Sequence, residues 1–292
     1  MPDHYTIDNS IPHFEGFSNA SFGELLQGVG TDNDDFLITL PIDLHSKARF
    51  YPDATIGCVT VFPKYKSKVK KFIDTFLDRF GYTASGNIII TSDIPEGKGL
   101  SSSTADMVAA FRCMQNYLKV DIELEKVGQI LREIEPSDGV LYPGSVVYKH
   151  KKCLFQKSLG VFPTTHIIAI DEGGVLDTIS YNKVKKDYSI EEKTMYALLR
   201  DDMAAAFEKK DYRRVGFIAM QSALMNQKYN NKKNLINCIN MLDQLGALGL
   251  ITTHSGTCIG IILDPEKNNV DDAYQLIQKT FPEDNIFTYK TI

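Results

Sequence analysis

The chain has 292 residues, a formal net charge of −5, 43% hydrophobic residues and 24% charged residues. These values are ordinary for a globular protein, and the length allows one large domain or two of common size. The acidic balance argues against nucleic-acid or anionic-membrane partners, which require a basic face. No run approaches the ~18 apolar residues that a membrane span requires.

The cysteines and the N-terminus indicate the cellular compartment. Residues Met1–His4 show no basic segment followed by an apolar one, so we expect no signal peptide. The cysteines are odd in number and include no Cys-x-x-Cys pair, which is typical of reduced thiols and gives no zinc signature. They are Cys58, Cys113, Cys153, Cys238 and Cys258. We expect a cytoplasmic protein.

The N-terminal half alternates apolar runs with helical patterns. The predicted strands are 36–40, 48–51, 59–62 and 87–91, and the predicted helices are 67–80, 102–118 and 124–134. Pro136 is expected to stop the last of these helices. A basic cluster, Lys64–Lys71, opens the first helix. We interpret it as a solvated helix face rather than a nucleic-acid patch, with proximity to a nucleotide as a minor alternative.

The C-terminal half begins near residue 155, where the pattern changes. It is predicted to contain strands at 165–170, 256–263 and 285–291 and helices at 190–209, 211–226, 232–246 and 270–280. No internal repeat and no low-complexity linker separates the halves. We therefore expect two α+β domains, residues 1–155 and 156–292, that share an interface.

The segment Pro95–Ala105 carries the strongest functional signal. It places Gly97 and Gly99, and then a run of serines, between the strand at 87–91 and the helix at 102–118. A glycine loop that enters a helix offers free N–H groups and the positive end of the helix dipole to an anion. Simple capping is the alternative, but one cap needs only one hydroxyl. We favour a phosphate site, of neither the Walker nor the dinucleotide type.

Two further segments carry functional side chains. Ser18–Gly28 is a turn-like stretch of small residues with a single carboxylate, Glu24. His254–Thr257 lies between two apolar runs. Taken singly, an ordinary turn and a hydrogen-bonded structural histidine are the simpler interpretations.

Together the three segments resemble the GHMP kinase superfamily, named for galactokinase, homoserine, mevalonate and phosphomevalonate kinases. Pro95–Thr104 matches its Pro-x-x-x-Gly-Leu-x-Ser-Ser-(Ala/Thr) signature at every fixed position. Gly23-Glu24 matches the N-terminal motif, and Ser255-Gly256 matches the C-terminal glycine turn. The three motifs occur in the expected order, so the resemblance covers nearly the whole chain.

Within the superfamily, the motifs resemble those of the L-threonine kinases of propanediol-utilisation and cobalamin-assembly pathways. The shared segments are Gly-Glu-Leu-x-Gln-Gly (Gly23–Gly28), Glu-Pro-Ser-Asp-Gly (Glu135–Gly139) and His-Ser-Gly (His254–Gly256). The chain departs from that subfamily at Phe22, where a cysteine is usual.

The resemblance implies a fold and a reaction. The N-terminal ATP-binding domain, 1–155, would have the ribosomal protein S5 domain 2-like fold, and the C-terminal domain, 156–292, would be ferredoxin-like. The enzyme would use ATP and Mg²⁺ to phosphorylate a small-molecule hydroxyl, with L-threonine as the first candidate. Alternatives are another hydroxylated amino acid (homoserine, serine or a non-protein amino acid), an isoprenoid alcohol, or a nucleotide-binding regulator without turnover.

The resemblance also implies how ATP, Mg²⁺ and the reacting hydroxyl are held. Ser103 would ligate Mg²⁺ together with Glu135, with Glu133 as the alternative glutamate. Asp138 would take the proton of the substrate hydroxyl, although a β-turn aspartate is its ordinary interpretation and homoserine kinases lack this base. The residues expected at the ATP phosphates are Pro95, Gly97, Lys98, Gly99, Leu100, Ser101, Ser102, Ser103 and Thr104.

An amino-acid acceptor needs a carboxylate for its ammonium group and donors for its carboxylate. Glu24 is the candidate for the ammonium group. The candidates on the substrate's other side are His254, Ser255, Gly256 and Thr257.

Overall fold

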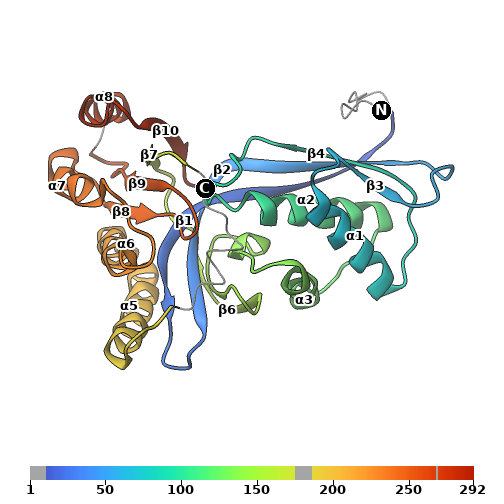
Figure 1. Ribbon diagram of the computed structural model, residues 1–292, viewed down its shortest axis with the longest axis horizontal. Coiled ribbons are helices and arrows are strands. Elements are labelled where there is room, and N and C mark those ends of the chain that lie inside the picture. Colours follow the sequence, from blue (N-terminus) through green and yellow to red (C-terminus); the bar gives the residue numbers. More distant parts are fainter. Residues whose placement is uncertain (1–10, 175–185, 268) are drawn as a thin grey trace.

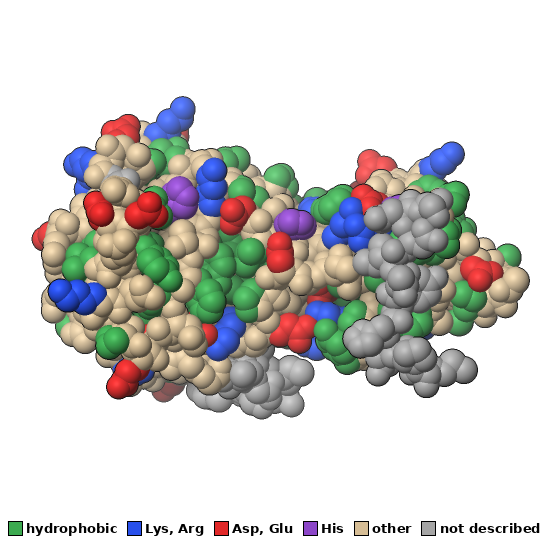
Figure 2. Space-filling model, turned by 90° about the horizontal axis from the view of Figure 1, so that it is seen from above, with side chains coloured by type: hydrophobic (Ala, Val, Ile, Leu, Met, Phe, Trp, Pro, Cys, Tyr) green, Lys and Arg blue, Asp and Glu red, His purple; other side chains and the backbone are tan. Residues whose placement is uncertain are grey.

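Two long strands connect the two lobes of the molecule. The computed structural model describes residues 11–174, 186–267 and 269–292. β1 (Phe14–Val29) and β2 (Asp35–Pro52) form an antiparallel pair that runs from one lobe into the other (Figure 1). Figure 2 shows the same elongated outline from above. The shared pair makes one sheet continuous through both halves.

The sheet has the strand order β10-β7-β9-β8-β1-β2-β4-β3, with β5 and β6 attached to β2 as a side branch. All pairings are antiparallel except that of β3 with β4. The remaining strands are β3 (Val59–Phe62), β4 (Gly86–Ser92), β5 (Ser145–Lys149), β6 (Leu154–Gly160), β7 (His166–Asp171), β8 (Gly249–Thr252), β9 (Cys258–Ile262) and β10 (Asn285–Lys290).

Three helices cover the sheet in the N-terminal lobe, and their bounds are those predicted: α1 (Ser67–Phe80), α2 (Ser102–Leu118) and α3 (Leu124–Ile134). α2 packs against β1 and β2, and α1 packs against α2. The apolar stripe of α1 is buried, and its Phe72 and Phe76 rings meet Phe111 of α2 edge to face. α3 ends one residue before the extended Glu135, as Pro136 requires.

In the described part of the C-terminal lobe lie α5 (Ile190–Glu208), α6 (Tyr212–Asn226), α7 (Leu235–Leu245) and α8 (Val270–Thr280). α5 begins at a capping box, in which the Ser189 hydroxyl and the Glu192 carboxylate satisfy each other's backbone N–H groups. α6 packs against β1 and β8. No helix in the described part of the chain is both long and apolar enough to cross a membrane.

The sequence patterns missed several strands. β1, β5 and β6 are additional to the prediction, β8 is the first of the two apolar runs around His254–Thr257, and β2 is a single strand where two were expected. The mixed α+β class is confirmed. The predicted boundary at 155/156 falls within β6 and stays a prediction, because the two lobes share one sheet. Met1–His4, on which the expected lack of a signal peptide rests, lies outside the described residues.

Candidate active site

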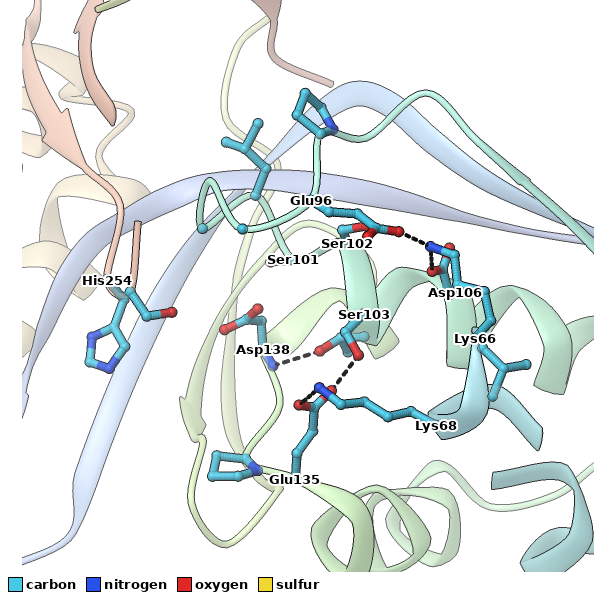
Figure 3. Close-up of a pocket in the computed structure, with 18 of the residues that line it drawn as sticks. Lys66, Lys68, Glu96, Ser101, Ser102, Ser103, Asp106, Glu135, Asp138 and His254 are labelled. Atoms are coloured by element: carbon cyan, nitrogen blue, oxygen red, sulfur yellow. Dashed lines mark hydrogen bonds and ion pairs between the residues drawn. The ribbon is translucent and has the colours of Figure 1, made fainter. Parts of the chain in front are cut away.

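A cavity of about 300 Å³ opens where the N-terminal ends of α1 and α2 face the loops before η1 (Gly139–Leu141) and after β8. Figure 3 shows these elements around it. Most predicted site residues line this cavity, although they come from four distant parts of the sequence: Glu24, Pro95, Gly97, Gly99, Leu100, Ser101, Ser102, Ser103, Thr104, Glu135, Asp138, His254 and Ser255.

The loop that leads into α2 is shaped to present the helix end. Gly97 and Gly99 adopt φ values of 72° and 77°, and Ser101 enters the left-handed region at 64°. Ser101 occupies the N-cap position without making a side-chain cap hydrogen bond. The Ser102 hydroxyl is buried and has no partner among the described residues. These serines therefore leave the first N–H groups of the helix to the cavity, as an anion site requires.

Two lysines from the start of α1 line the same end of the cavity. Lys66 pairs with Asp106 at 2.6 Å and with Glu96 at 2.5 Å (Figure 3). Lys68 pairs with Glu135 at 2.5 Å. The interpretation of this basic cluster as a solvated face is therefore wrong for Lys66, whose side chain is 11% exposed, whereas the Lys68 side chain is 39% exposed. Their sequence pattern indicated an amphipathic helix, but the pattern gave no sign that the helix end faces α2.

Ser103 and Glu135 contact each other directly. The Ser103 hydroxyl donates to one oxygen of Glu135, while Lys68 contacts the other oxygen. The alternative glutamate, Glu133, instead pairs with Arg79 on the surface. A hydroxyl and a carboxylate are hard oxygen ligands that fit Mg²⁺, which keeps most of its coordination shell as water. Ser103 and Glu135 thus fit the expected ion.

Asp138 lies between Ser103 and His254 in Figure 3. Its backbone N–H donates to the Thr104 hydroxyl at 3.4 Å, which ties its loop to α2. Burial raises the pKa of Asp138 to about 6, a hydrogen bond from Ser101 opposes this rise, and the Glu135 charge adds to it. A carboxylate with a pKa near 6 is ionised at neutral pH and still basic enough to accept a proton.

Glu24 projects from β1 at a break in the strand register. The pairing of β1 with β2 shifts between Ser21 and Glu24, and the Glu24 side chain is only 3% exposed. Burial raises the pKa of Glu24 well above its ordinary value, and the Asp138 charge raises it further. One of its oxygens, Oε2, has no hydrogen-bond partner among the described residues.

Two histidines, His150 and His254, line the cavity together with Glu24. The Nδ1 atom of His254 lies 2.5 Å from Oε1 of Gln27, and burial lowers the pKa of His254 well below its ordinary value. The His254 ring meets that of His150 edge to face, with 5.1 Å between the ring centroids. His150 also lines the cavity, and our sequence reasoning missed it. Its position after an unpredicted strand offered no motif that could have revealed it.

Lys98, Gly256 and Thr257 were predicted site residues but do not line the cavity. Lys98 pairs with Asp171 at 2.7 Å, and the Thr257 hydroxyl donates to the same carboxylate. A Cβ atom at Gly256 would lie 1.9 Å from the Lys98 carbonyl oxygen. These residues join the loop before α2 to the C-terminal lobe and so hold the wall of the cavity.

Phe22, the position at which the chain departs from the L-threonine kinase motif, is fully buried. Its ring contacts Tyr289 and the backbone position of Gly260. Phe22 does not line the cavity, so this departure changes core packing next to Glu24 rather than a cavity-lining group.

Comparisons with known proteins identify the family of the chain. Residues 67–141 match the GHMP kinases N terminal domain, and residues 203–283 match the GHMP kinases C terminal family. The chain is 24% identical to an L-threonine kinase from Citrobacter freundii, across 86% of this chain and 87% of the relative. It is 26% identical to a homoserine kinase from Listeria innocua, across 70% of this chain and 72% of that protein.

A solved structure shows the same fold. The homoserine kinase from Cytophaga hutchinsonii superposes with a TM-score of 0.75 at 16% identity, covering 99% of this chain and 97% of the other. This likeness confirms the predicted α+β GHMP kinase fold with N- and C-terminal domains. The chain belongs to the GHMP kinase superfamily and is an ATP-dependent phosphotransferase that acts on an alcohol group.

Proposed function

We propose that this kinase phosphorylates the side-chain hydroxyl of a small amino acid, with L-threonine as the first candidate and O-phospho-L-threonine as the product. One observation carries the proposal. A single cavity joins the serine run at the start of α2 to a buried polar end lined by Glu24, Asp138 and His254. The first end suits a triphosphate, and the second suits a small zwitterion.

The triphosphate would lie against the N-terminus of α2. The free N–H groups of the helix and the Ser102 hydroxyl would donate to phosphate oxygens. Lys66 and Lys68 supply positive charge beside them. Mg²⁺, held by Ser103 and Glu135, would neutralise phosphate charge when bound. In this proposal Lys98 supports the loop and does not contact the phosphates.

Asp138 is the proposed general base. The acceptor oxygen forms a bond to the γ-phosphorus as the bond from that phosphorus to the ADP oxygen breaks. The proton of the acceptor hydroxyl passes to the carboxylate of Asp138. The pKa of about 6 supports this role, because burial makes the carboxylate a better proton acceptor than a solvated aspartate.

Glu24 is the proposed partner of the substrate ammonium group. A buried carboxyl with one unpartnered oxygen is costly to ionise by itself, and a bound cation would favour its charged form. Ser255, at the same end of the cavity, could donate a hydrogen bond to the substrate. An isoprenoid alcohol has no positive charge to meet Glu24 and Asp138, which favours an amino-acid acceptor.

L-Homoserine is the second candidate. A homoserine kinase is among the relatives. L-Homoserine, like L-threonine, carries an ammonium group, a carboxylate and a hydroxyl. It differs from L-threonine in the position of the hydroxyl, which lies one carbon farther from the backbone. We also propose a cytoplasmic location, which the five free cysteines support, and a place in cobalamin assembly if L-threonine is the acceptor.

A coupled ADP-release assay tests the proposal. The purified protein is given MgATP and, in separate reactions, L-threonine, L-homoserine, L-serine and mevalonate. We expect turnover to be fastest with a hydroxy amino acid and slow with mevalonate. Turnover with mevalonate alone would refute an amino-acid acceptor, and ATP binding without turnover on any acceptor would favour a regulator.

A further inference from the structure

One buried histidine of the cavity has no role in the phosphoryl transfer described above. His150 directly follows β5, is 3% exposed and lines the cavity. Neither of its ring nitrogens, Nδ1 or Nε2, has a hydrogen-bond partner among the described residues. Burial of an imidazole without partners is unfavourable, so the ring is available to a ligand at little competing cost.

Hydrogen bonds fix the backbone of His150 beside the loop that carries Asp138. Its carbonyl oxygen accepts from the N–H of Ser137 at 3.3 Å, from the N–H of Cys153 at 3.3 Å and from the Cys153 thiol at 3.4 Å. Ser137 is the neighbour of Asp138 in the chain. The turn after β5 is thereby fixed relative to the proposed base, and His150 is positioned before any ligand binds.

The ring itself is also oriented. It packs edge to face against His254, whose Nδ1 atom is engaged by Gln27. His254 is therefore committed in part to the protein, whereas neither ring nitrogen of the cavity-lining His150 has a partner among the described residues. Of the two rings, His150 is the better candidate for a substrate contact.

The charges around this end of the cavity differ between its two sides. Asp35, Lys151 and Lys186 all act on His150, and Lys151 pairs with Asp35 at 2.8 Å. The negative charge of Asp138 instead acts on Glu24. A substrate with a carboxylate toward His150 and an ammonium group toward Glu24 matches both sides.

We propose that a ring N–H of His150 donates a hydrogen bond to the α-carboxylate of the acceptor and thereby selects hydroxyl compounds that carry a carboxylate. This inference rests on the proposed function, which supplies the acceptor class. His150 is a specificity-determining residue here and takes no proton in the transfer. Burial lowers its pKa to about 3, which makes it a poor base at neutral pH, and Asp138 already holds that role.

The test compares two acceptors that differ only in the carboxylate. L-Threonine and 1-amino-2-propanol share the ammonium group and the hydroxyl, and only the first has the carboxylate. In His150→Leu, which removes the N–H and roughly keeps the volume, we expect KM for L-threonine to rise by about 10- to 100-fold with kcat nearly unchanged. We expect KM for 1-amino-2-propanol to stay within about twofold of the wild-type value.

Matched variants separate recognition from structure. His150→Asn keeps an N–H donor and should recover part of the loss, while His45→Leu changes an exposed histidine outside the cavity and should change neither KM. Equal losses on both acceptors in His150→Leu and His150→Asn would overturn the inference, and so would an unchanged KM for L-threonine. If the wild type prefers L-homoserine, the pair becomes L-homoserine and 3-amino-1-propanol.

The two levels of the proposal fail in different ways. Wild-type turnover on L-threonine combined with equal effects of His150→Leu on both acceptors defeats the role of His150 alone. A wild type that phosphorylates no hydroxy amino acid defeats the proposed function and this inference with it.

Discussion

The proposed phosphate and acceptor ends of the cavity differ in how their charged and titratable side chains are satisfied. At the phosphate end, charged side chains pair with one another, as Lys66 does with Asp106 and Lys68 with Glu135. At the acceptor end, Glu24 and His150 are each only 3% exposed and leave polar atoms unpartnered among the described residues. Both sets of side chains line the same cavity. The two ends therefore differ in how their side chains are paired.

This difference suggests how each end responds to its ligand. If ATP binds there as proposed, Lys66 and Lys68 would exchange protein carboxylates for phosphate oxygens, so binding would replace one set of ion pairs by another. At the acceptor end, a ligand satisfies groups whose burial is costly without it. The acceptor end should therefore discriminate more sharply, because a ligand that lacks one complementary group leaves a buried group unpaired.

The largest expected effect comes from removing the carboxylate of Asp138, the proposed general base. Asp138→Asn keeps the shape of the side chain and removes its ability to take a proton. We expect kcat to fall by about 10²- to 10⁴-fold while the affinity for ATP changes little, as measured by ADP release and by equilibrium nucleotide binding. Asp93→Asn, at an exposed carboxylate near His45, serves as the control and should keep normal turnover.

The pH dependence gives an independent check on the same residue. Because the raised pKa of Asp138 is about 6, the carboxylate is protonated below this pH and cannot act as a base. The kcat/KM of the wild type should fall as pH drops through about 6. This decline should be absent from the residual activity of Asp138→Asn. A decline of the same shape in both proteins would assign the ionisation to another group.

The next effect separates the two candidate metal ligands at the phosphate end. Glu135→Gln should raise the Mg²⁺ concentration needed for half-maximal rate by about tenfold or more, because it weakens a hard oxygen ligand. Glu133→Gln should not change this concentration, since Glu133 pairs with Arg79 on the surface. Titration of activity with Mg²⁺ at fixed ATP measures both. Equal shifts in the two variants would remove Glu135 from the metal site.

At the acceptor end, Glu24→Gln should weaken substrate binding and stabilise the fold. We expect KM for the amino acid to rise about tenfold or more with a small change in kcat. The folded-state pKa of Glu24 is raised, so its contribution to stability is present at low pH and is lost as pH rises above the unfolded value of 4.5. Each unit of that rise costs about 1.4 kcal/mol at high pH.

Thermal melting across pH 5 to 8 measures this stability effect. The wild type should lose more stability than Glu24→Gln as the pH rises, and the variant should be the more stable protein at pH 8. A variant that is less stable at every pH would contradict the assignment of an unpaired, buried carboxyl to Glu24.

The smallest expected effect compares two lysines of the phosphate end. Lys68→Met should raise KM for ATP by about tenfold, because it removes a cation that lines the cavity. Lys98→Met should leave KM for ATP within about twofold, because Lys98 pairs with Asp171 outside the cavity lining. Steady-state kinetics with varied ATP decide between the two. A larger effect at Lys98 would return it to the phosphate site.

The sequence predicted the parts of this molecule whose signals are local. α1, α2 and α3 have the predicted bounds because apolar spacing and Pro136 act within one helix. The loop from Pro95 to Thr104 was found because its glycines and serines are contiguous. β1 was missed because its small residues, such as those from Ser18 to Ser21, read as a turn when the pairing strand is unknown.

Non-local contacts explain what the sequence did not show at the site. Lys66 meets Asp106 and Lys68 meets Glu135 only after α1 and α3 pack beside α2. His150 reaches the cavity through the pairing of β5 with β2, and neither the strand nor the pairing was predicted. Lys98 was placed at the phosphates because it lies within the motif, whereas its side chain is held by Asp171 of the other lobe.

Identification of the product tests the central claim most directly, namely that one end of the cavity holds ATP and the other holds a hydroxy amino acid. The enzyme is incubated with MgATP and L-threonine, and the mixture is resolved by ³¹P NMR and mass spectrometry. We predict one phosphomonoester, O-phospho-L-threonine, formed in equal amount to ADP and absent with Asp138→Asn. ADP accompanied only by inorganic phosphate, with no phosphorylated amino acid from L-threonine or L-homoserine, would contradict the account.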